Sequence, residues 1–350
     1  MPSPASLTVD LNALAHNFHA LEAASGAAVH PVVKADSYGL GATPVARRLM
    51  VEGARTFFVA RAAEGVALRA ALGPAPVIYV LDGCHGDTAS AQKAADLRPI
   101  LNQPVQLQAW RAAGGGACGL QIDTGMSRLG FRPEDAPEPF EGLALVMSHL
   151  ACADAPADSM NRRQRDDFAA VSARYPGAIR SFSNSGGCFM GADFAFDAVR
   201  PGISLYGGGP EGRPDDRIRA VATLSAEVVQ VRPVRKGETV GYSAGWTAPR
   251  DSTVAIVAAG YADGVLRSYS PRGKVWLAGA LRPIVGRVSM DVIAVDVTDA
   301  EVADAEVAVG DLCEIYGPNR NIDDQATAAG TIAYELLTSI TPRVPRVYVG

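Results

Sequence analysis

Short apolar runs alternate with amphipathic stretches between Val29 and Tyr206. The runs are rich in β-branched residues, and the stretches between them are rich in Ala, Arg and Glu, a rhythm that predicts parallel strands joined by helices. A helix at residues 11–23, with Asp10 as its N-cap, precedes them. Eight strand–helix units in succession indicate a (β/α)8 TIM-type barrel, whose functional residues follow the carboxyl ends of the strands. The expected strands lie at residues 30–34, 56–60, 77–81, 98–101, 118–123, 144–149, 179–183 and 199–205.

The pattern changes after Leu224. Helical periodicity fades, and β-rich runs are separated by Gly, Pro and Asp, which indicates a mainly-β domain. We therefore predict an α/β protein with two domains: the barrel at residues 1–217 and a C-terminal mainly-β domain at residues 218–350. The clearest β runs of the second domain lie at residues 226–231, 253–258 and 275–278.

Composition narrows the classes of function. Of 350 residues, 48% are apolar and 20% are charged, which is typical of a chain that forms a soluble core. The net charge of −5 disfavours binding to the phosphate backbone of nucleic acids. No apolar run is long enough to span a bilayer, and the N-terminus lacks the features of a secretion signal. We therefore expect a cytoplasmic protein that binds neither nucleic acid nor membrane.

Cysteine and histidine spacing gives no sign of a metal centre. The five cysteines are widely separated and form no C-x-x-C pair, so we expect buried or idle thiols. The five histidines form no H-x-x-x-H motif and no cluster with cysteine. The sequence therefore predicts no metal site.

Polar residues at the ends of predicted strands are candidates for chemistry. Lys34 follows the apolar pair Val32 and Val33, where a lysine is shielded from water and can act as a nucleophilic amine; most lysines lie instead on the solvated surface. Residues 183–187 and 200–203 are rich in small residues, include Arg200, and follow or form strands seven and eight. Together they resemble a phosphate cup, although such turns are often plain connectors.

With these residues in place, the chain resembles a known family, the alanine racemases that depend on pyridoxal 5′-phosphate (PLP). The resemblance runs nearly end to end and implies a barrel followed by a β domain, with PLP as cofactor. It is carried, in order, by VVKADSYG at 32–39, DTGMSRLGF at 123–131, SHLACAD at 148–154, SNSG at 183–186, RPGISLYG at 200–207, VGYS at 240–243, GYADG at 260–264, GRVSMD at 286–291 and TPRVPR at 341–346.

The resemblance implies two catalytic residues. Lys34 would be bound covalently to PLP and would act as the base facing the α-hydrogen of the D-enantiomer. Tyr242 would act from the opposite face on the L-enantiomer. Inverting a stereocentre requires a proton to leave one face of a planar carbanion and return to the other, so bases on both faces are the simplest solution. In family members this tyrosine comes from the neighbouring subunit, which implies a homodimer with shared active sites.

The resemblance also implies binding residues. Arg200 would face the pyridine nitrogen of PLP. His149 would hydrogen-bond Arg200 and fix its orientation, with a satisfied core histidine as the equally open alternative. The matches to the family's phosphate contacts are Tyr38, Ser185, Gly202, Ile203 and Tyr334. The substrate carboxylate would be held by Arg128 and by the backbone N–H of Met290, and Tyr261 would line the entrance. Asp263 and Asp291 are expected to be structural turn residues or to support the residues that contact the substrate.

One position departs from the family pattern. Many members have a carbamylated lysine seven residues before the substrate arginine, and here that residue is Gln121. A neutral amide can hydrogen-bond Arg128 but cannot pair its charge. We therefore predict no carbamylated lysine and no stimulation of activity by bicarbonate.

The sequence favours an enzyme that interconverts L- and D-alanine and supplies D-alanine for peptidoglycan of the bacterial cell wall. Three alternatives stay open. A racemase of the same fold could act on serine, lysine or arginine, because a few side chains can redirect specificity. The other two are a non-catalytic PLP-carrier barrel and a decarboxylase of related architecture.

Overall fold

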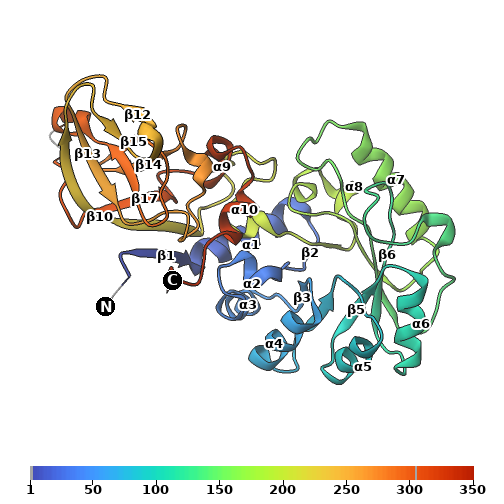
Figure 1. Ribbon diagram of the computed structural model, residues 1–350. Helices are drawn as coiled ribbons and strands as arrows, with labels where there is room; N and C mark the ends of the chain where they lie inside the picture. The colour runs from blue at the N-terminus through green and yellow to red at the C-terminus, as the bar shows by residue number, and fades with distance from the viewer. Residues whose placement is uncertain (1–2, 304–305) are drawn as a thin grey trace. The chain divides into compact units, whose positions relative to one another are not determined.

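The computed structural model describes residues 3–303 and 306–350. The chain forms two compact units. One runs from Leu14 to Leu205, and the other combines the N-terminal residues up to Ala13 with Tyr206–Gly350. In Figure 1 the first is blue to yellow-green and the second is mainly yellow to red. We describe them as the barrel unit and the β unit.

The barrel unit contains an eight-stranded sheet in which all strand pairs are parallel. Backbone hydrogen bonds close it into a barrel: His30 N–H donates to Val199 O at 2.9 Å, and Val33 N–H donates to Phe58 O at 2.8 Å. The predicted (β/α)8 barrel is thereby confirmed. Its strands, in sheet order, are β2 (Ala28–Val29), β9 (Ala198–Val199), β8 (Ile179–Ser181), β7 (Leu143–Met147), β6 (Cys118–Gln121), β5 (Arg98–Leu101), β4 (Val77–Val80) and β3 (Thr56–Val59).

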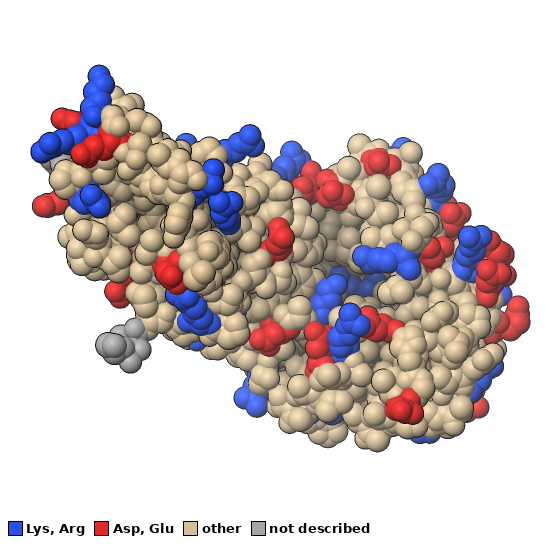
Figure 2. All heavy atoms as spheres, in the orientation of Figure 1, with Lys and Arg blue, Asp and Glu red and all other residues tan. Residues whose placement is uncertain are grey.

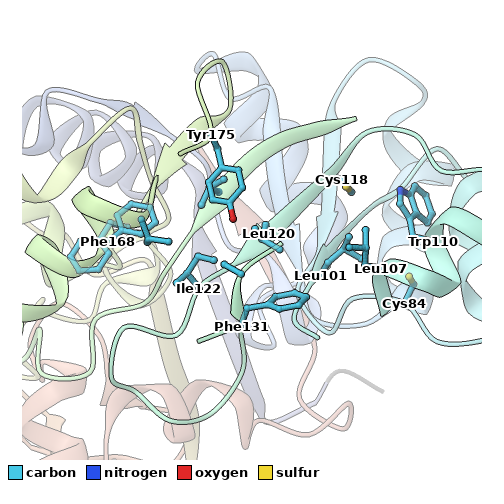
Figure 3. Close-up of a cluster of buried hydrophobic side chains, with 14 of the residues drawn as sticks. Cys84, Leu101, Leu107, Trp110, Cys118, Leu120, Ile122, Phe131, Phe168 and Tyr175 are labelled. Carbon is cyan, nitrogen blue, oxygen red and sulfur yellow. The ribbon is translucent and has the colours of Figure 1, made fainter. Parts of the chain in front are cut away.

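Helices cover the outside of these strands, because every parallel crossover must carry the chain back along the sheet (Figure 1). Between helices and strands lies a cluster of buried side chains that includes Leu120, Phe131 and Phe168 (Figure 3). Burying these aromatic and aliphatic groups is the main favourable term in forming the unit. The helices that begin before or within it are α1 (Leu11–Ser25), α2 (Lys34–Tyr38), α3 (Ala42–Val51), α4 (Ala62–Leu72), α5 (Asp87–Ala94), α6 (Pro104–Ala112), α7 (Ser159–Ser172) and α8 (Ala192–Ala195).

Most of the predicted barrel strands end a few residues earlier than expected, and the first and the eighth differ most. The first pairs as β2 and again at Val32, which forms an isolated bridge with Phe58, and the chain leaves the strand direction at Lys34. The eighth ends at Val199. Proline lacks the N–H that a strand ladder needs, so Pro201 prevents β9 from continuing, and the chain turns instead into a 3-10 helix at Ile203–Tyr206.

The β unit is built around an eight-stranded sheet and a small hairpin. Strand β10 is long and pairs with three neighbours, β1, β13 and β17. The sheet order is β13 (Ser252–Val257), β16 (Ile293–Asp296), β15 (Ala280–Val285), β14 (Lys274–Leu277), β17 (Leu312–Tyr316), β10 (Ala222–Val234), β1 (Ala5–Asp10) and β18 (Arg346–Val349). The hairpin consists of β11 (Thr239–Val240) and β12 (Trp246–Thr247), and two helices follow, α9 (Ile322–Ala329) and α10 (Ala333–Thr338).

The N-terminal strand differs from what the sequence led us to expect. β1 pairs with β10 and β18 of the β unit, whereas we placed residues 1–217 together in the barrel. Its alternating burial, with Ala5, Leu7 and Val9 inside, explains why it needs a sheet partner. The Asp10 carboxylate accepts the N–H groups of the first turn of α1 at 2.8 and 2.9 Å, which is the predicted N-cap.

Within the described ranges, no helix is both long enough and apolar enough to cross a membrane.

Candidate active site

Lys34 stands at the mouth of the barrel on an unusual turn. Residues 35–38 all have positive φ, between 51° and 58°, so α2 is a short left-handed turn. L-residues pay about 1–2 kcal/mol each for this conformation. Burial lowers the pKa of Lys34, and Arg128 lowers it further, while Glu64 and Asp82 act in the opposite direction. A lysine with a lowered pKa is a better nucleophile at neutral pH.

Arg200 lies inside the barrel and is 3% exposed. Its guanidinium donates to the Ser181 hydroxyl at 2.7 Å and to the carbonyls of Ser148 and Phe182, and it lies over the Phe58 ring, 5.9 Å from the ring centre. None of these partners is a carboxylate. Burial lowers the pKa of Arg200 to about 9, so at neutral pH it keeps its charge in an apolar setting.

The predicted hydrogen bond between His149 and Arg200 is not present in the described structure. The guanidinium of Arg200 donates to Ser181 and to two carbonyls, and not to the His149 ring. Burial lowers the pKa of His149 to about 3, and the positive charges of Arg200, Arg128 and Lys34 contribute. His149 is therefore neutral at pH 7. Its backbone carbonyl accepts the Gln164 amide at 3.0 Å, which fixes the segment after β7.

Positive charge converges at this end of the barrel. Lys34, Arg128 and Arg200 all lie close enough to act on His149, and Arg200 also contributes to lowering the pKa of His30 to about 4. Figure 2 shows Lys and Arg side chains gathered around a hollow in the surface of this unit. Like charges held together cost free energy unless an anion joins them. The arrangement fits a ligand with several negative groups.

A cluster of small residues follows Arg200 in the chain and contacts Ser185. The Ser185 hydroxyl accepts the N–H groups of Gly202 at 3.0 Å and Ser204 at 3.2 Å. A side chain at Gly202 would lie 2.2 Å from the Tyr38 hydroxyl, so only glycine allows this approach. The Ser204 hydroxyl is buried and has no hydrogen-bond partner. Hydroxyls and N–H groups on a glycine-rich loop are the donors that a phosphate needs.

The loop that carries Arg128 is held by side chains at both ends. The Asp123 carboxylate accepts three successive N–H groups, those of Gly125, Met126 and Ser127, at 2.9–3.0 Å. Gln121 donates its side-chain amide to Leu129 O at 2.9 Å. The sequence suggested that Gln121 would contact Arg128 itself, whereas the structure shows that it holds the neighbouring carbonyl.

Phe131 anchors the far end of this loop in the apolar cluster of the barrel unit (Figure 3). Arg128 lines a surface cavity of about 450 Å³ together with Arg61, Asp82 and His85. Arg61 and Asp82 form an ion pair at 2.6 Å. Arg128 therefore faces a polar space with a guanidinium fork that suits a carboxylate.

In the β unit, Tyr242 lies on the loop that joins β11 to β12. Its side chain is 68% exposed, which is high for a tyrosine. The loop has a tight shape, because Gly241 has φ 80° and Ser243 has φ 59°. A side chain at Gly241 would approach the backbone of Arg287 to 3.0 Å. The backbone conformation of this loop therefore keeps the Tyr242 side chain exposed to solvent.

Tyr261 and Met290 lie on two loops that are bonded to each other. Tyr261 N–H donates to Ser289 O at 3.0 Å, and Ala262 N–H donates to Met290 O at 2.9 Å. Arg343 bridges the same loops by pairing with Asp263 at 2.9 Å and Asp291 at 2.8 Å. Through Arg343 the two aspartates hold these loops together.

The predicted site residues divide between the two units. Tyr334 lies on α10 and is 39% exposed. The sequence did not single out two residues that hold parts of the predicted site in place. Glu64 accepts the backbone N–H next to Lys34, and Arg343 pairs with Asp263 and Asp291. Arg343 lies in the TPRVPR motif at 341–346, which marked the segment but gave this arginine no role. Glu64 has no such signal, because Ala35 is 29 residues away in the chain. The barrel unit carries Lys34, Tyr38, Arg128, His149, Ser185, Arg200, Gly202 and Ile203, and the β unit carries Tyr242, Tyr261, Met290 and Tyr334.

Comparison with known proteins agrees with this geometry. The model of the alanine racemase N-terminal domain matches residues 9–210, and that of the C-terminal domain matches residues 221–348. The chain belongs to the alanine racemase family. It is therefore an isomerase of that family, with the barrel and β domain that the sequence predicts.

Relatives of the family resemble the chain along its whole length. The alanine racemase of Cereibacter sphaeroides is 47% identical, covering 98% of each chain, and that of Rhizobium meliloti is 45% identical, covering 98% of this chain and 96% of the relative. The crystal structure of alanine racemase from Bartonella henselae, with covalently bound pyridoxal phosphate, superimposes with a TM-score of 0.92 at 36% identity, covering 99% of this chain and 100% of that one.

Proposed function

We propose that this protein is a PLP-dependent alanine racemase that works in the cytoplasm and supplies D-alanine for peptidoglycan. The observation that carries the proposal is the convergence of Lys34, Arg128 and Arg200 around His149 at the barrel mouth. Membership of the alanine racemase family supports it, as do the names of relatives that match nearly the whole chain.

The residues of the barrel unit fit PLP. Tyr38, Ser185, Gly202 and Ile203 would hold its phosphate, with Tyr334 completing the set, and the unpartnered Ser204 hydroxyl offers a further donor. When bound, PLP supplies an electron-accepting ring that makes the α-hydrogen of an attached amino acid acidic. Arg200 would face the ring nitrogen. A guanidinium there disfavours a second positive charge and so limits how strongly the ring withdraws electrons.

Lys34 and Tyr242 would be the two bases. Lys34 would hold the cofactor covalently and exchange a proton on the face of D-alanine, and Tyr242 would exchange a proton on the face of L-alanine. A residue that acts on a second surface must be accessible, and the 68% exposure of Tyr242 agrees with that requirement. We propose that the Tyr242 of one subunit acts in the site of the other, so that the active enzyme is a homodimer with shared sites.

Arg128, Met290 and Tyr261 would bind the substrate. The Arg128 guanidinium can donate to both oxygens of a carboxylate in a bidentate pair, and the backbone N–H of Met290 adds a donor. Tyr261 would line the entrance and limit the size of the side chain that passes. His149, neutral at pH 7, adds no further charge to this cationic group.

A chiral assay of D-amino acid formation tests the proposal. Purified protein with PLP is given L-alanine, L-serine, L-lysine and L-arginine in separate reactions, with Lys34→Ala and Tyr242→Phe as controls. We expect D-alanine to form fastest and both variants to lose activity by at least about a thousandfold, as general bases contribute at that level. Borohydride should fix the cofactor on Lys34 of the wild type.

Other outcomes identify the alternatives. Faster racemisation of serine, lysine or arginine would replace the alanine assignment. Labelling of Lys34 without racemisation of any amino acid would indicate a PLP carrier, and release of CO₂ from the amino acid would indicate a decarboxylase. Protein that neither binds PLP nor racemises alanine would overturn the proposal entirely.

A further inference from the structure

One carboxylate joins two neighbouring strand–helix loops of the barrel. Glu64 lies in the first turn of α4, and one of its oxygens accepts the N–H groups of Ala60 at 2.8 Å and Arg61 at 3.0 Å. This is the usual bond of a capping-box glutamate to the start of its own helix. The other oxygen accepts the N–H of Ala35 at 2.8 Å. Ala35 directly follows Lys34, and helices α2 and α4 lie side by side (Figure 1).

The backbone that Glu64 holds is strained. Four residues in succession, 35–38, have positive φ although none is glycine. At about 1–2 kcal/mol each, the turn persists only if its surroundings fix it. Within the turn, Asp36 accepts the N–H of Ala42 at 2.6 Å through its side chain and that of Gly41 at 2.9 Å through its carbonyl. The bond to Glu64 ties the beginning of the turn to the loop after β3.

Glu64 also acts on Lys34 through its charge. Burial and Arg128 lower the pKa of Lys34, and Glu64 is the first of the two carboxylates that oppose them. The second, Asp82, forms an ion pair with Arg61. Glu64 therefore combines a hydrogen bond beside Lys34 with a charge felt by it, and the two effects can be separated with variants.

We propose that Glu64 is a positioning residue for Lys34. Its carboxylate holds the left-handed turn through Ala35 and so directs the lysine side chain toward the cofactor and the substrate. The inference rests on the proposed function for the role of Lys34 only. The link between Glu64 and the shape of the turn stands independently of it.

Substitution at Glu64 separates its roles. Glu64→Gln keeps the size of the side chain but has one accepting oxygen, so it cannot serve both Ala35 and the start of α4. Asp158→Ala is the matched control for lost capping, because Asp158 caps α7 by accepting the N–H of Met160 at 2.8 Å. Asp82→Asn is the control for lost charge, since no hydrogen bond joins its side chain to the described turn.

Two readouts follow each variant: amide hydrogen exchange of a peptide that spans residues 34–41, and PLP binding with kcat and KM for alanine. For Glu64→Gln we expect exchange in this peptide to rise at least tenfold, the rate of borohydride labelling of Lys34 to fall, and kcat to fall about tenfold with a smaller change in KM. Asp158→Ala and Asp82→Asn should leave exchange of the peptide as in the wild type.

Two results would overturn the proposal. One is unchanged exchange in the 34–41 peptide of Glu64→Gln. The other is faster exchange with wild-type labelling and kcat, since Glu64 would then stabilise the turn without directing the lysine. Failure of the proposed function looks different, because the wild type itself would neither be labelled at Lys34 nor racemise alanine.

Discussion

At the scale of single residues, the site is defined by how few of its cations have a carboxylate partner. Arg200 is buried against a hydroxyl, two carbonyls and an aromatic ring, and His149 is kept neutral by burial and surrounding charge. Burying unpaired cations is costly. A site that keeps them is one in which a ligand supplies the negative charge, as a phosphate and a carboxylate together would.

Gln121 gives a prediction at this scale. Gln121→Ala removes the hydrogen bond to Leu129 O, so the loop carrying Arg128 is held less firmly and KM for alanine should rise roughly fivefold, since a hydrogen bond contributes about 1 kcal/mol. Bicarbonate should not change the rate of the wild type. Gln92→Ala is the matched control, because Gln92 is also buried and donates to a loop carbonyl, Gly83 O at 2.9 Å. Stimulation by bicarbonate, or an unchanged KM, would contradict this account.

At the scale of elements, the strands were easier to predict than the turns between them. Strand β5 begins and ends where we expected, because a buried parallel strand is a short apolar run with polar ends. The left-handed turn after Lys34 was not predicted. Ala, Ser and Tyr rarely adopt positive φ, and a single Asp among them does not predict four such residues in succession. The bond that fixes the beginning of the turn comes from Glu64, 29 residues away.

The helices of the β unit and strand β1 were missed for different reasons. α9 and α10 are short, and packing within a β-rich unit stabilises them more than their own propensity does. In β1 the alternation of Leu7 and Val9 was visible in the sequence. Its partner β10 begins more than two hundred residues later, so local pattern alone could not assign the strand to a domain.

The start of α9 gives a prediction about pH. Asp323 is 2% exposed and accepts the N–H of Gly209 at 2.7 Å, and burial raises the pKa of its carboxyl from 3.8 to about 6. Between these values the folded state holds a proton that the unfolded chain has lost, so this group makes folding less favourable as pH rises from about 4 to about 6. Above pH 6 the full cost is present.

Asp323→Asn removes that cost and keeps an oxygen that can accept from Gly209. Chemical denaturation should show the variant more stable than the wild type at pH 8, by on the order of 2 kcal/mol. The difference should be much smaller at pH 4, where the carboxyl is protonated in the folded state and only partly ionised in the unfolded chain. A variant that is less stable at both pH values to the same extent would show that the charge of Asp323 is not the source of the cost.

At the scale of the whole molecule, the expected site residues are shared between two compact units. In the barrel unit Tyr38, Ser185 and Arg200 are buried, whereas Arg128 is exposed, as Tyr242 is on its hairpin. The resemblance to known racemases already predicted that site residues would come from both units, because its motifs include residues of each. Sequence pattern alone identified the barrel and Lys34 but gave no reason to single out Tyr242.

Mixing two inactive variants tests the central claim most directly. Lys34→Ala and Tyr242→Phe proteins are each assayed alone, then dissociated, combined in equal amounts, reassociated and assayed again. If the Tyr242 of one subunit acts with the Lys34 of the other, a hybrid dimer has one complete site, and random reassociation should restore about one quarter of wild-type racemase activity. Two wild-type preparations taken through the same steps control for losses. Hybrid dimers that form but show no more activity than the separate variants would contradict a site shared between subunits.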